Sequence, residues 1–218
     1  MPPMISVSMQ TSEIVAAFDR EVSSRLAPHG FRKSPAGHFS RLLTADAHGH
    51  FGYALYTDRR TGQAQAWPVA GVRFNGVERL LCELAEEPFE EHGSFTIGKP
   101  IGFFMRRWDM AEWPVTSLDD AAPVAKAVVT ALLTYGVPYM ESHCTLEAAV
   151  QEMSPEQHGG SHDGPKLAVT YYLLGEHEKS LQVLDFQLER LSRGGYPDAE
   201  RFYTLAANLR ERIGAAGR

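Results

Sequence analysis

The sequence lacks any long apolar run and has few cysteines and few lysines. No stretch approaches the 18 apolar residues that a membrane helix needs, so we expect no membrane span. The start of the chain has no basic region followed by an apolar run, and we expect no secretory signal there. Five lysines accompany 16 arginines, and this ratio, with abundant alanine and glycine, is typical of a GC-rich bacterial genome. We therefore expect a soluble bacterial protein located in the cytoplasm.

Cysteine and metal-binding patterns are equally sparse. The two cysteines, Cys82 and Cys144, lie in apolar stretches and are expected to be buried or half-buried free thiols. Zinc needs three or four ligands, and the pair His48 and His50 has no third ligand at a typical spacing. We predict that the protein binds no metal and no other cofactor.

The motifs of common enzyme classes are also missing. The chain has no Gly-x-x-x-x-Gly-Lys or Gly-x-Gly-x-x-Gly pattern for phosphates and no Gly-x-Ser-x-Gly elbow for a serine nucleophile. The acidic pairs Glu86-Glu87 and Glu90-Glu91 are interpreted as a solvated helix end. We predict no catalytic residue. The net charge of −6 argues against a broad nucleic-acid surface, which requires a basic face.

What is present is an ordinary globular composition. Hydrophobic residues make up 44% and charged residues 22% of the 218 residues, close to the values of about 45–50% and about 25% for soluble domains. This length is sufficient for a hydrophobic core and for one or two domains.

Hydrophobic spacing predicts an α+β domain over residues 12–153. The clearest helix covers residues 12–26, where Ile14, Phe18, Val22 and Leu26 recur every four residues. The other expected elements are strands at 39–44, 51–56, 65–74 and 94–105, helices at 77–86, 120–135 and 145–153, and a loop at 106–117.

Several single residues refine these elements. His48-Gly49 is expected to form the turn between the first two strands, and Asp58 to Gly62 is expected to form a hairpin loop. Pro68 indicates a sheet edge or a strand start because it cannot donate to a ladder. Ala70-Gly71, where the strand changes phase, is expected to be a β-bulge.

Gly136 and Pro138 are expected to end the helix that starts near Asp120. In this interpretation Gly136 is the left-handed residue after the helix, and Pro138 prevents the helix from continuing.

The segment Ser154 to Gly164 is rich in glycine, serine and histidine and is the best candidate linker. After it, residues 163–213 read as three helices. Gly175 is expected to end the first helix, and the second has Leu181, Leu184, Leu188 and Leu191 as one stripe. The predicted fold class is thus α+β: an antiparallel sheet with helices on one face, followed by a C-terminal helical hairpin or three-helix tail. Such a short tail needs the first domain or another chain to cover its apolar surface.

The first domain resembles a bacterial family catalogued as a domain of unknown function. That family has a helix, then Leu-x-x-x-Gly-Phe-x-Lys and Phe-x-Arg, and later a glycine and a proline after a helix. The matching residues are Leu26, Gly30, Phe31, Lys33, Phe39, Arg41 and Tyr135 to Tyr139. The resemblance covers about residues 12–150, and the family has no established activity that it would imply for this chain. Some relatives look like immunity proteins or neighbours of toxin genes.

The tail resembles a single tetratricopeptide helix pair. Tyr171, Gly175, Ser180 and Leu184 fall at the offsets of that repeat's tyrosine, glycine, small residue and large apolar residue. The repeat needs about three copies for stability, and the chain has one. An ordinary helical hairpin is the alternative.

Binding residues are sought where arginine and aromatic side chains gather. Arg106, Arg107 and Trp108 follow the last strand and could hold an anion or an acidic partner surface. A second group is Tyr53, Tyr56, Trp67, Arg73 and Phe74, which could share one sheet face. From these groups we select Arg106, Arg107, Trp108, Tyr56, Trp67 and Arg73 as candidate binding residues.

The leading hypothesis is a non-enzymatic protein-binding module, of the immunity type if the family resemblance holds. Its partner would be another protein or a second copy of the chain, with no role for a membrane or a nucleic acid. The alternatives are a small-ligand-binding protein and a hydrolase-like enzyme whose site has no familiar motif. An enzyme should show convergent titratable groups, whereas an interaction protein should expose apolar or aromatic residues.

Overall fold

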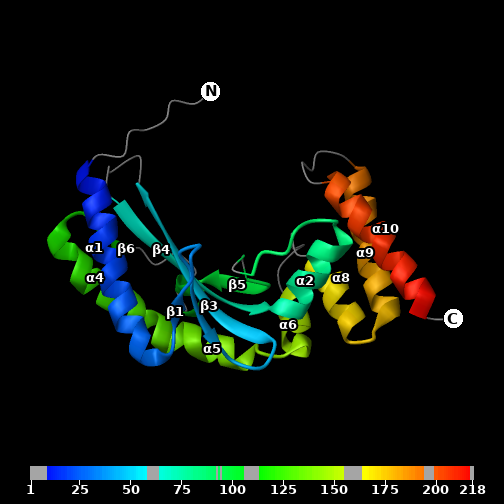
Figure 1. The fold of residues 1–218 in the computed structure, drawn as a ribbon, viewed down its shortest axis with the longest axis horizontal. Coiled ribbons are helices and arrows are strands. Elements are labelled where there is room, and N and C mark those ends of the chain that lie inside the picture. Colours follow the sequence, from blue (N-terminus) through cyan, green and yellow to red (C-terminus); the bar gives the residue numbers. More distant parts are fainter. Residues whose placement is uncertain are drawn as a thin grey trace. The chain divides into compact units, whose positions relative to one another are not determined.

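The computed structural model describes residues 9–57, 64–91, 93, 95–105, 113–154, 164–193 and 199–216. Within these residues, six strands form one antiparallel sheet, and helices accompany and follow it (Figure 1). The strand order is β1-β2-β3-β4-β5, and β6 pairs with β4. The predicted α+β class, with an antiparallel sheet followed by helices, is confirmed.

The sheet contains two long strands and four short ones. The strands are β1 Arg32–Lys33, β2 Phe39–Leu42, β3 Ala47–Thr57, β4 Ala64–Phe74, β5 Ile97–Pro100 and β6 Trp113–Pro114. The helices before the linker are α1 Met9–Leu26, the 3-10 turn η1 Ala27–His29, α2 Asn75–Leu84, α3 Ile101–Phe104, α4 Leu118–Ala131, the π-helical turn η2 Leu132–Gly136, α5 Val137–Ser142 and α6 Leu146–Met153. The helices after it are α8 Gly164–Leu173, α9 His177–Ser192 and α10 Ala199–Ala216.

The chain folds into two compact units built from interleaved segments. The first unit consists of Met1–Leu42, Gly49–Gly71 and Gly98–Glu141, and the second of Leu43–His48, Val72–Ile97 and Ser142–Arg218. The second unit therefore combines α2 with all of the helices that follow Ser142. The division into residues 12–153 and 163–213 stays a prediction, and linker residues 155–163 lie outside the described residues.

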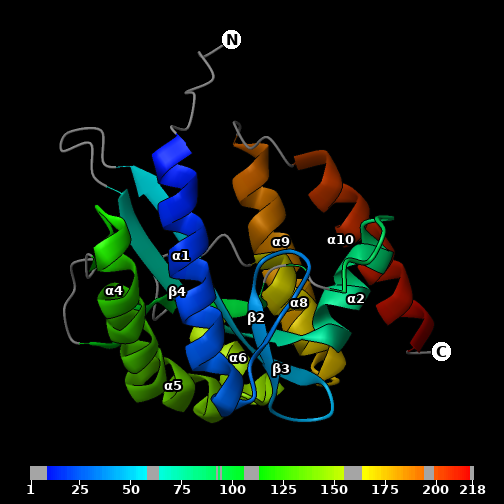
Figure 2. The same cartoon turned by 60° about the vertical axis from the view of Figure 1, so that its left-hand side comes forward.

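The core of the first unit forms around α1. Its predicted stripe is confirmed, since Ile14, Phe18, Val22 and Leu26 are all buried, and α1 packs against α4 (Figure 2). Phe18 meets Tyr53 of β3 edge-to-face, with 5.0 Å between ring centroids. Helix and sheet are thus joined through aromatic side chains.

Tyr53 also fixes the polar side of α1, because its hydroxyl donates to Asp19 Oδ1 at 2.6 Å. Burial raises the pKa of Tyr53 above its ordinary value, and the hydrogen bond and negative charge of Asp19 raise it further. The same carboxylate pairs with Lys33 of β1.

The helix that begins at Leu118 does not end at Gly136, and the prediction that it would was wrong. It passes through η2 and continues as α5 to Ser142. Pro138 has no N–H for an intrahelical bond, and its ring would clash with the carbonyl of the preceding turn in an α-helix. A π-helical turn is one of the distortions that allow a long helix to absorb such a break.

Gly136 lets η2 pack closely against β4. The sequence analysis had instead predicted a left-handed backbone conformation for this glycine. Its φ is not positive. A Cβ at this position would lie 2.7 Å from Leu132 Cδ1 and 3.0 Å from the Cβ of Ala70 on β4. The first distance is shorter than real Cβ contacts and the second is tighter than most of them, so any larger residue would force Leu132 or β4 to shift, and glycine lets η2 approach the sheet this closely.

The continuous helical segment Leu118–Ser142 has the length and apolar composition of a membrane span, with a mean hydropathy of 1.3 in its most apolar window. Within that window, 39% is buried inside the protein, and Val128 and Leu132 are fully buried in the first unit. The core helix of a soluble protein has the same properties, so this segment is weak evidence for a membrane role.

The second unit packs α2 against α8 and α10, and α8 against α6 and α9. The helix expected at residues 77–86 is α2, and its apolar residues Leu80, Leu81 and Leu84, which the spacing had placed on the inner face, are buried. In the leucine stripe of α9, Leu184 is fully buried, whereas its other members are half-buried. Helices α2 and α6 therefore supply part of the cover that the tail was expected to need.

The turn between α8 and α9 forms as the sequence predicts. Gly175 has a left-handed φ of +76°, and its N–H donates to Tyr172 O at 3.0 Å. The Glu176 N–H reaches back to Tyr171 O at 2.9 Å. These two bonds define a Schellman motif, which ends a helix and satisfies its last carbonyls.

Four local expectations were wrong because they ignored distant pairing. His48-Gly49 lies inside β3, while the turn before β3 is closed by Leu43 N donating to Ala47 O. Pro68 is not on an edge, because β4 pairs with β3 on one side and with β5 and β6 on the other. Residues 101–104 form α3 and not a strand. Trp113, expected in a loop, pairs with Ala66 in β6.

Candidate protein-binding surface

Of the six predicted binding residues, the structure describes Tyr56, Trp67 and Arg73. Arg106, Arg107 and Trp108 lie outside the described residues. Tyr56 on β3 and Trp67 on β4 belong to the first unit, and Arg73 belongs to the second. The structure brings Tyr56 and Trp67 together, and their position is the basis of the candidate surface.

Tyr56 and Trp67 form a ring pair across the two long strands. Their ring centroids are 5.8 Å apart with an interplanar angle of 60°. The Tyr56 hydroxyl donates to Oε1 of Gln65 at 2.7 Å, and Gln65 is itself only 6% exposed. The ring of Tyr56 is therefore held at both its face and its polar end. We call Tyr56 and Trp67 the aromatic pair.

The aromatic pair lies on the sheet face that points away from α1. Side chains alternate along a strand, so Tyr53 and Tyr56 point to opposite faces. Tyr53 points to Phe18 of α1, and Tyr56 points away and is 37% exposed. The hypothesis that the aromatic residues of both strands share one face was therefore wrong for Tyr53.

Small side chains lie on the same face of β3 as the aromatic pair. Ala54 is exposed, and Gly52 follows the same alternation. A Cβ at Gly52 would lie 2.9 Å from Nδ1 of His38, so the glycine makes room for that ring. Trp67 is half-buried, and its indole thus offers apolar surface on this face of the sheet.

Arg73 is engaged by the chain itself. It is 3% exposed, and its Nε donates to Oδ1 of Asn75 at 3.1 Å, while Nη2 donates to Glu90 O at 2.6 Å. Its guanidinium also lies over the ring of Phe89, 5.4 Å from the centroid. Burial lowers the pKa of Arg73, and the charges of Glu78, Cys82 and Glu90 oppose that shift. These contacts fasten the end of β4 to the segment after α2.

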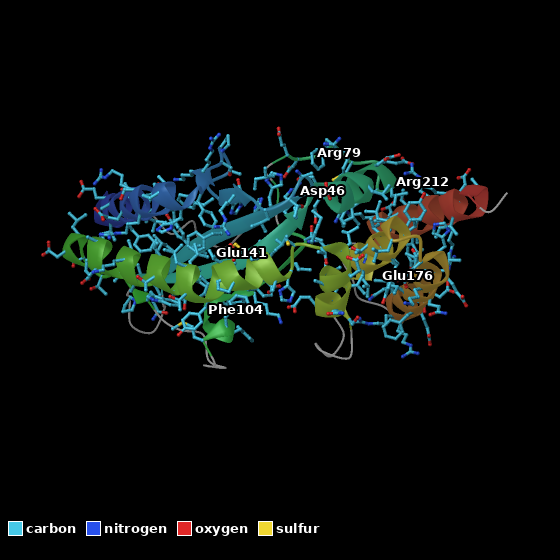
Figure 3. All side chains as sticks on the ribbon, turned by 90° about the horizontal axis from the view of Figure 1, so that it is seen from below. Asp46, Arg79, Phe104, Glu141, Glu176 and Arg212 are labelled. Carbon is cyan, nitrogen blue, oxygen red and sulfur yellow. The ribbon has the colours of Figure 1, made fainter. Side chains whose placement is uncertain are left out.

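A second exposed aromatic group lies on α3, directly before the predicted residues 106–108. Phe103 is 46% exposed, and the Phe104 ring lies 4.5 Å from the ring of Tyr139 (Figure 3). Sequence analysis missed it because the period of two in residues 95–103 indicated a strand. Pro100, with φ −54° at the start of α3, was the available signal, since proline is favoured where a helix begins.

The groups that could support other chemistry are limited. Among the described residues, no three His, Cys, Asp or Glu side chains are grouped as metal ligands. Cys82 and Cys144 are half-buried thiols that are not joined in a disulfide. Of the chain's 21 basic and 27 acidic residues, 11 and 9 belong to the first unit and 10 and 18 to the second. The first unit thus has a net charge of 11 − 9 = +2 and the second of 10 − 18 = −8. The negative charge of the whole chain therefore does not argue against an acidic partner for the first unit.

No family profile, curated protein or solved structure matches the chain. The resemblances to a bacterial family of unknown function and to a tetratricopeptide pair therefore stay predictions. Any functional conclusion must come from the geometry of the residues themselves.

Proposed function

We propose that the protein is a protein-binding module and that the aromatic pair, Tyr56 and Trp67, is the centre of its contact surface. The observation that carries this proposal is a half-exposed Tyr–Trp pair held in place on the sheet face opposite α1. Tyrosine and tryptophan are enriched among residues that contribute most to protein–protein affinity. Their polar tips and large apolar rings suit a surface that is wet when free and buried when bound.

Pre-organisation strengthens the argument. A side chain that must be immobilised on binding costs about 0.5–1.5 kcal/mol. The Tyr56 ring is already fixed by Gln65 and Trp67, so most of that cost is met in folding. Ala54 on the same face is exposed and has a short side chain, which leaves room for an apolar side chain of the partner. The expected partner is therefore a protein that inserts an apolar residue next to Trp67.

The hypothesis is tested by photo-crosslinking the full-length protein. A photoreactive benzoyl-phenylalanine replaces Tyr56 in one sample and Leu42 in the other, and both are irradiated in lysate of the source cells. Leu42 is a matched control, because it is an apolar residue of the same unit and is 65% exposed. We expect a discrete protein adduct, which is either another protein or a second copy of the chain, from position 56 only. Equal adducts from both positions, or none from position 56, would contradict the proposal.

The hydrolase-like alternative is favoured by one observation in the second unit, which involves none of these residues. The side chains of Ser142, His143 and Glu152 lie close together there.

A further inference from the structure

Three side chains at the junction of α5 and α6 line up in the second unit. Ser142 is the last residue of α5, and its Oγ lies 2.9 Å from Nδ1 of His143. On the other side of the imidazole, Nε2 of His143 lies 3.7 Å from Oε2 of Glu152 in α6. The hydroxyl, the imidazole and the carboxylate are thus in contact in the order that serine hydrolases use for nucleophile, base and acid.

Solvent exposure decreases from the hydroxyl through the imidazole to the carboxylate, as a nucleophile, base and orienting acid require. Ser142 is exposed, the His143 side chain is 26% exposed, and the Glu152 side chain is 10% exposed. A substrate can therefore reach the hydroxyl, while the carboxylate is shielded from water. An ion interacts more strongly with its partner where water is excluded.

The carboxylate also sets the direction of the proton. The negative charge of Glu152, with Oε2 at 3.7 Å from Nε2, favours the tautomer of His143 that carries its proton on Nε2. In that tautomer Nδ1 is an acceptor, and Ser142 Oγ–H donates to it. In this arrangement the proton of the Ser142 hydroxyl can pass to His143, and the positive charge that forms on the imidazole lies next to the Glu152 carboxylate.

Helix α6 holds this geometry. Thr145 caps it, with Ala148 N donating to Thr145 Oγ1 at 3.3 Å and Ala149 N donating to Thr145 O at 3.1 Å. Glu152 follows Thr145 by seven residues, which is about two helical turns, and so returns to the side of α6 on which the helix starts. Its neighbours Ala149 and Met153 are buried and fix the rotation of the helix.

We propose that Ser142 is a nucleophile for small carboxylic esters, with His143 as its general base and Glu152 as the residue that positions His143. This function is independent of the protein-binding proposal, because it uses residues of the other unit. An exposed hydroxyl at a helix end favours small, activated esters over substrates that must be enclosed.

The reaction proceeds in two balanced steps. Ser142 Oγ attacks the ester carbonyl, and its proton passes to Nδ1 of His143 while the Oγ–carbon bond forms. The carbon–oxygen bond to the leaving group then breaks, and the leaving alkoxide takes the proton from Nδ1. A water molecule next gives its proton to Nδ1 and attacks the acyl-serine, and Ser142 leaves with that proton. The net change is hydrolysis of an ester to an acid and an alcohol, and Glu152 stabilises the imidazolium in both steps.

The experiment measures p-nitrophenyl acetate hydrolysis by the full-length protein and maps acetylation by mass spectrometry. Removing a positioned acid–base group costs about 100-fold or more in rate. We expect Ser142→Ala and His143→Gln each to lose the rate above background, and wild-type protein to be acetylated on Ser142. Glu152→Gln should lower kcat with KM unchanged, and Glu152→Asp should recover part of it.

Two controls separate this site from adventitious reactivity. Cys144→Ser tests whether the neighbouring thiol takes the acetyl group, and His29→Gln removes an exposed histidine of the first unit. Both should retain the wild-type rate, and circular dichroism melts should show all variants folded. Wild-type hydrolysis no faster than background, acetylation on Cys144 or lysines alone, or full activity in folded Ser142→Ala would overturn the proposal.

Discussion

Gly136→Ala tests the packing of the π-helical turn against the sheet. In an ordinary helix interior this change stabilises a protein by about 1 kcal/mol, because glycine loses more backbone freedom on folding. Here the new methyl group would lie 2.7 Å from Leu132 Cδ1 and 3.0 Å from the Cβ of Ala70. Both neighbours are fully buried, so neither can move into solvent to make room.

The two effects have opposite signs, and the second is larger. Overpacking a well-filled core costs about 1–3 kcal/mol, and the helix-propensity gain offsets about 1 kcal/mol of it. We expect a net loss of about 1 kcal/mol in the free energy of unfolding. For a chain of this length that corresponds to a fall in Tm of about 2–4 °C.

The matched control is Gly214→Ala in α10. Nothing lies within 4 Å of a Cβ at Gly214, so the same chemical change should raise stability by about 0.5 kcal/mol in this last helical turn. Thermal melts followed by far-UV circular dichroism measure both variants. Opposite shifts in Tm are expected from the two substitutions.

A double-mutant cycle identifies the clash itself. Ala70→Gly removes the methyl group that lies 3.0 Å from the new Cβ, so Ala70→Gly with Gly136→Ala should be more stable than the sum of the two single changes predicts. If Gly136→Ala raises Tm as Gly214→Ala does, or if the cycle is additive, close packing does not explain Gly136.

Three further predictions concern other helix ends and contacts. Glu86 has a left-handed φ of 58° at the end of α2, so Glu86→Gly should raise the free energy of unfolding by about 0.5–1 kcal/mol in urea titrations, whereas Glu86→Ala should not. Hydrogen bonds from Thr116 and Ser117 lower the pKa of Asp120 below its ordinary value of 3.8. The ionised carboxylate therefore adds its full contribution to the free energy of unfolding above pH 3.8, and that contribution is lost as the pH falls through the lowered pKa. The stability difference between wild type and Asp120→Asn should therefore shrink in acid melts, and a constant difference down to pH of about 2 would contradict this linkage. Ser180 is fully buried and donates to the carbonyl of residue 168 on α8 at 2.8 Å. Ser180→Val should therefore lower the free energy of unfolding by about 1–3 kcal/mol, and Ser180→Ala should lower it less. Equal stability of Ser180→Val and wild type in urea titrations would show that the contact between α8 and α9 does not require a small residue at this position.

The parts of the fold that sequence analysis predicted correctly depend on local periodicity. The stripe of α1 and the leucines of α2 are amphipathic patterns whose buried faces do not depend on the partner. Gly175 was identified because a glycine after an apolar helix has a specific backbone role. In each of these cases the information lies within a few residues of the sequence.

The errors involve partners far away in the sequence. Gly136 is explained by Ala70, which lies on β4, and neither the spacing nor the composition around position 136 indicates that contact. Trp113 was placed in a loop because two residues are too few for a periodic signal, yet pairing with Ala66 makes them a strand. Residues 101–104 alternate like a strand, and only Pro100 indicated the helix.

The candidate sites were predictable only in part. Tyr56 and Trp67 were selected as aromatic residues in neighbouring strands, and strand alternation could already have separated Tyr53 from them. The alignment of Ser142, His143 and Glu152 was not predictable, because it depends on where α6 places Glu152 relative to His143 in three dimensions. Arg73 was selected as a basic residue of an aromatic sheet face, whereas its burial against Phe89 and Glu90 was visible only in three dimensions.

The most direct test of the protein-binding proposal is the affinity of the crosslinked partner for variants of the aromatic pair. Calorimetry would compare wild type with Trp67→Ala, Tyr56→Ala and the control Leu42→Ala. Residues at the centre of an interface cost about 2 kcal/mol or more when truncated, which is roughly a 30-fold increase in Kd. We expect that increase for Trp67→Ala and Tyr56→Ala and an unchanged Kd for Leu42→Ala. An unchanged Kd for both aromatic variants would show that the partner binds elsewhere.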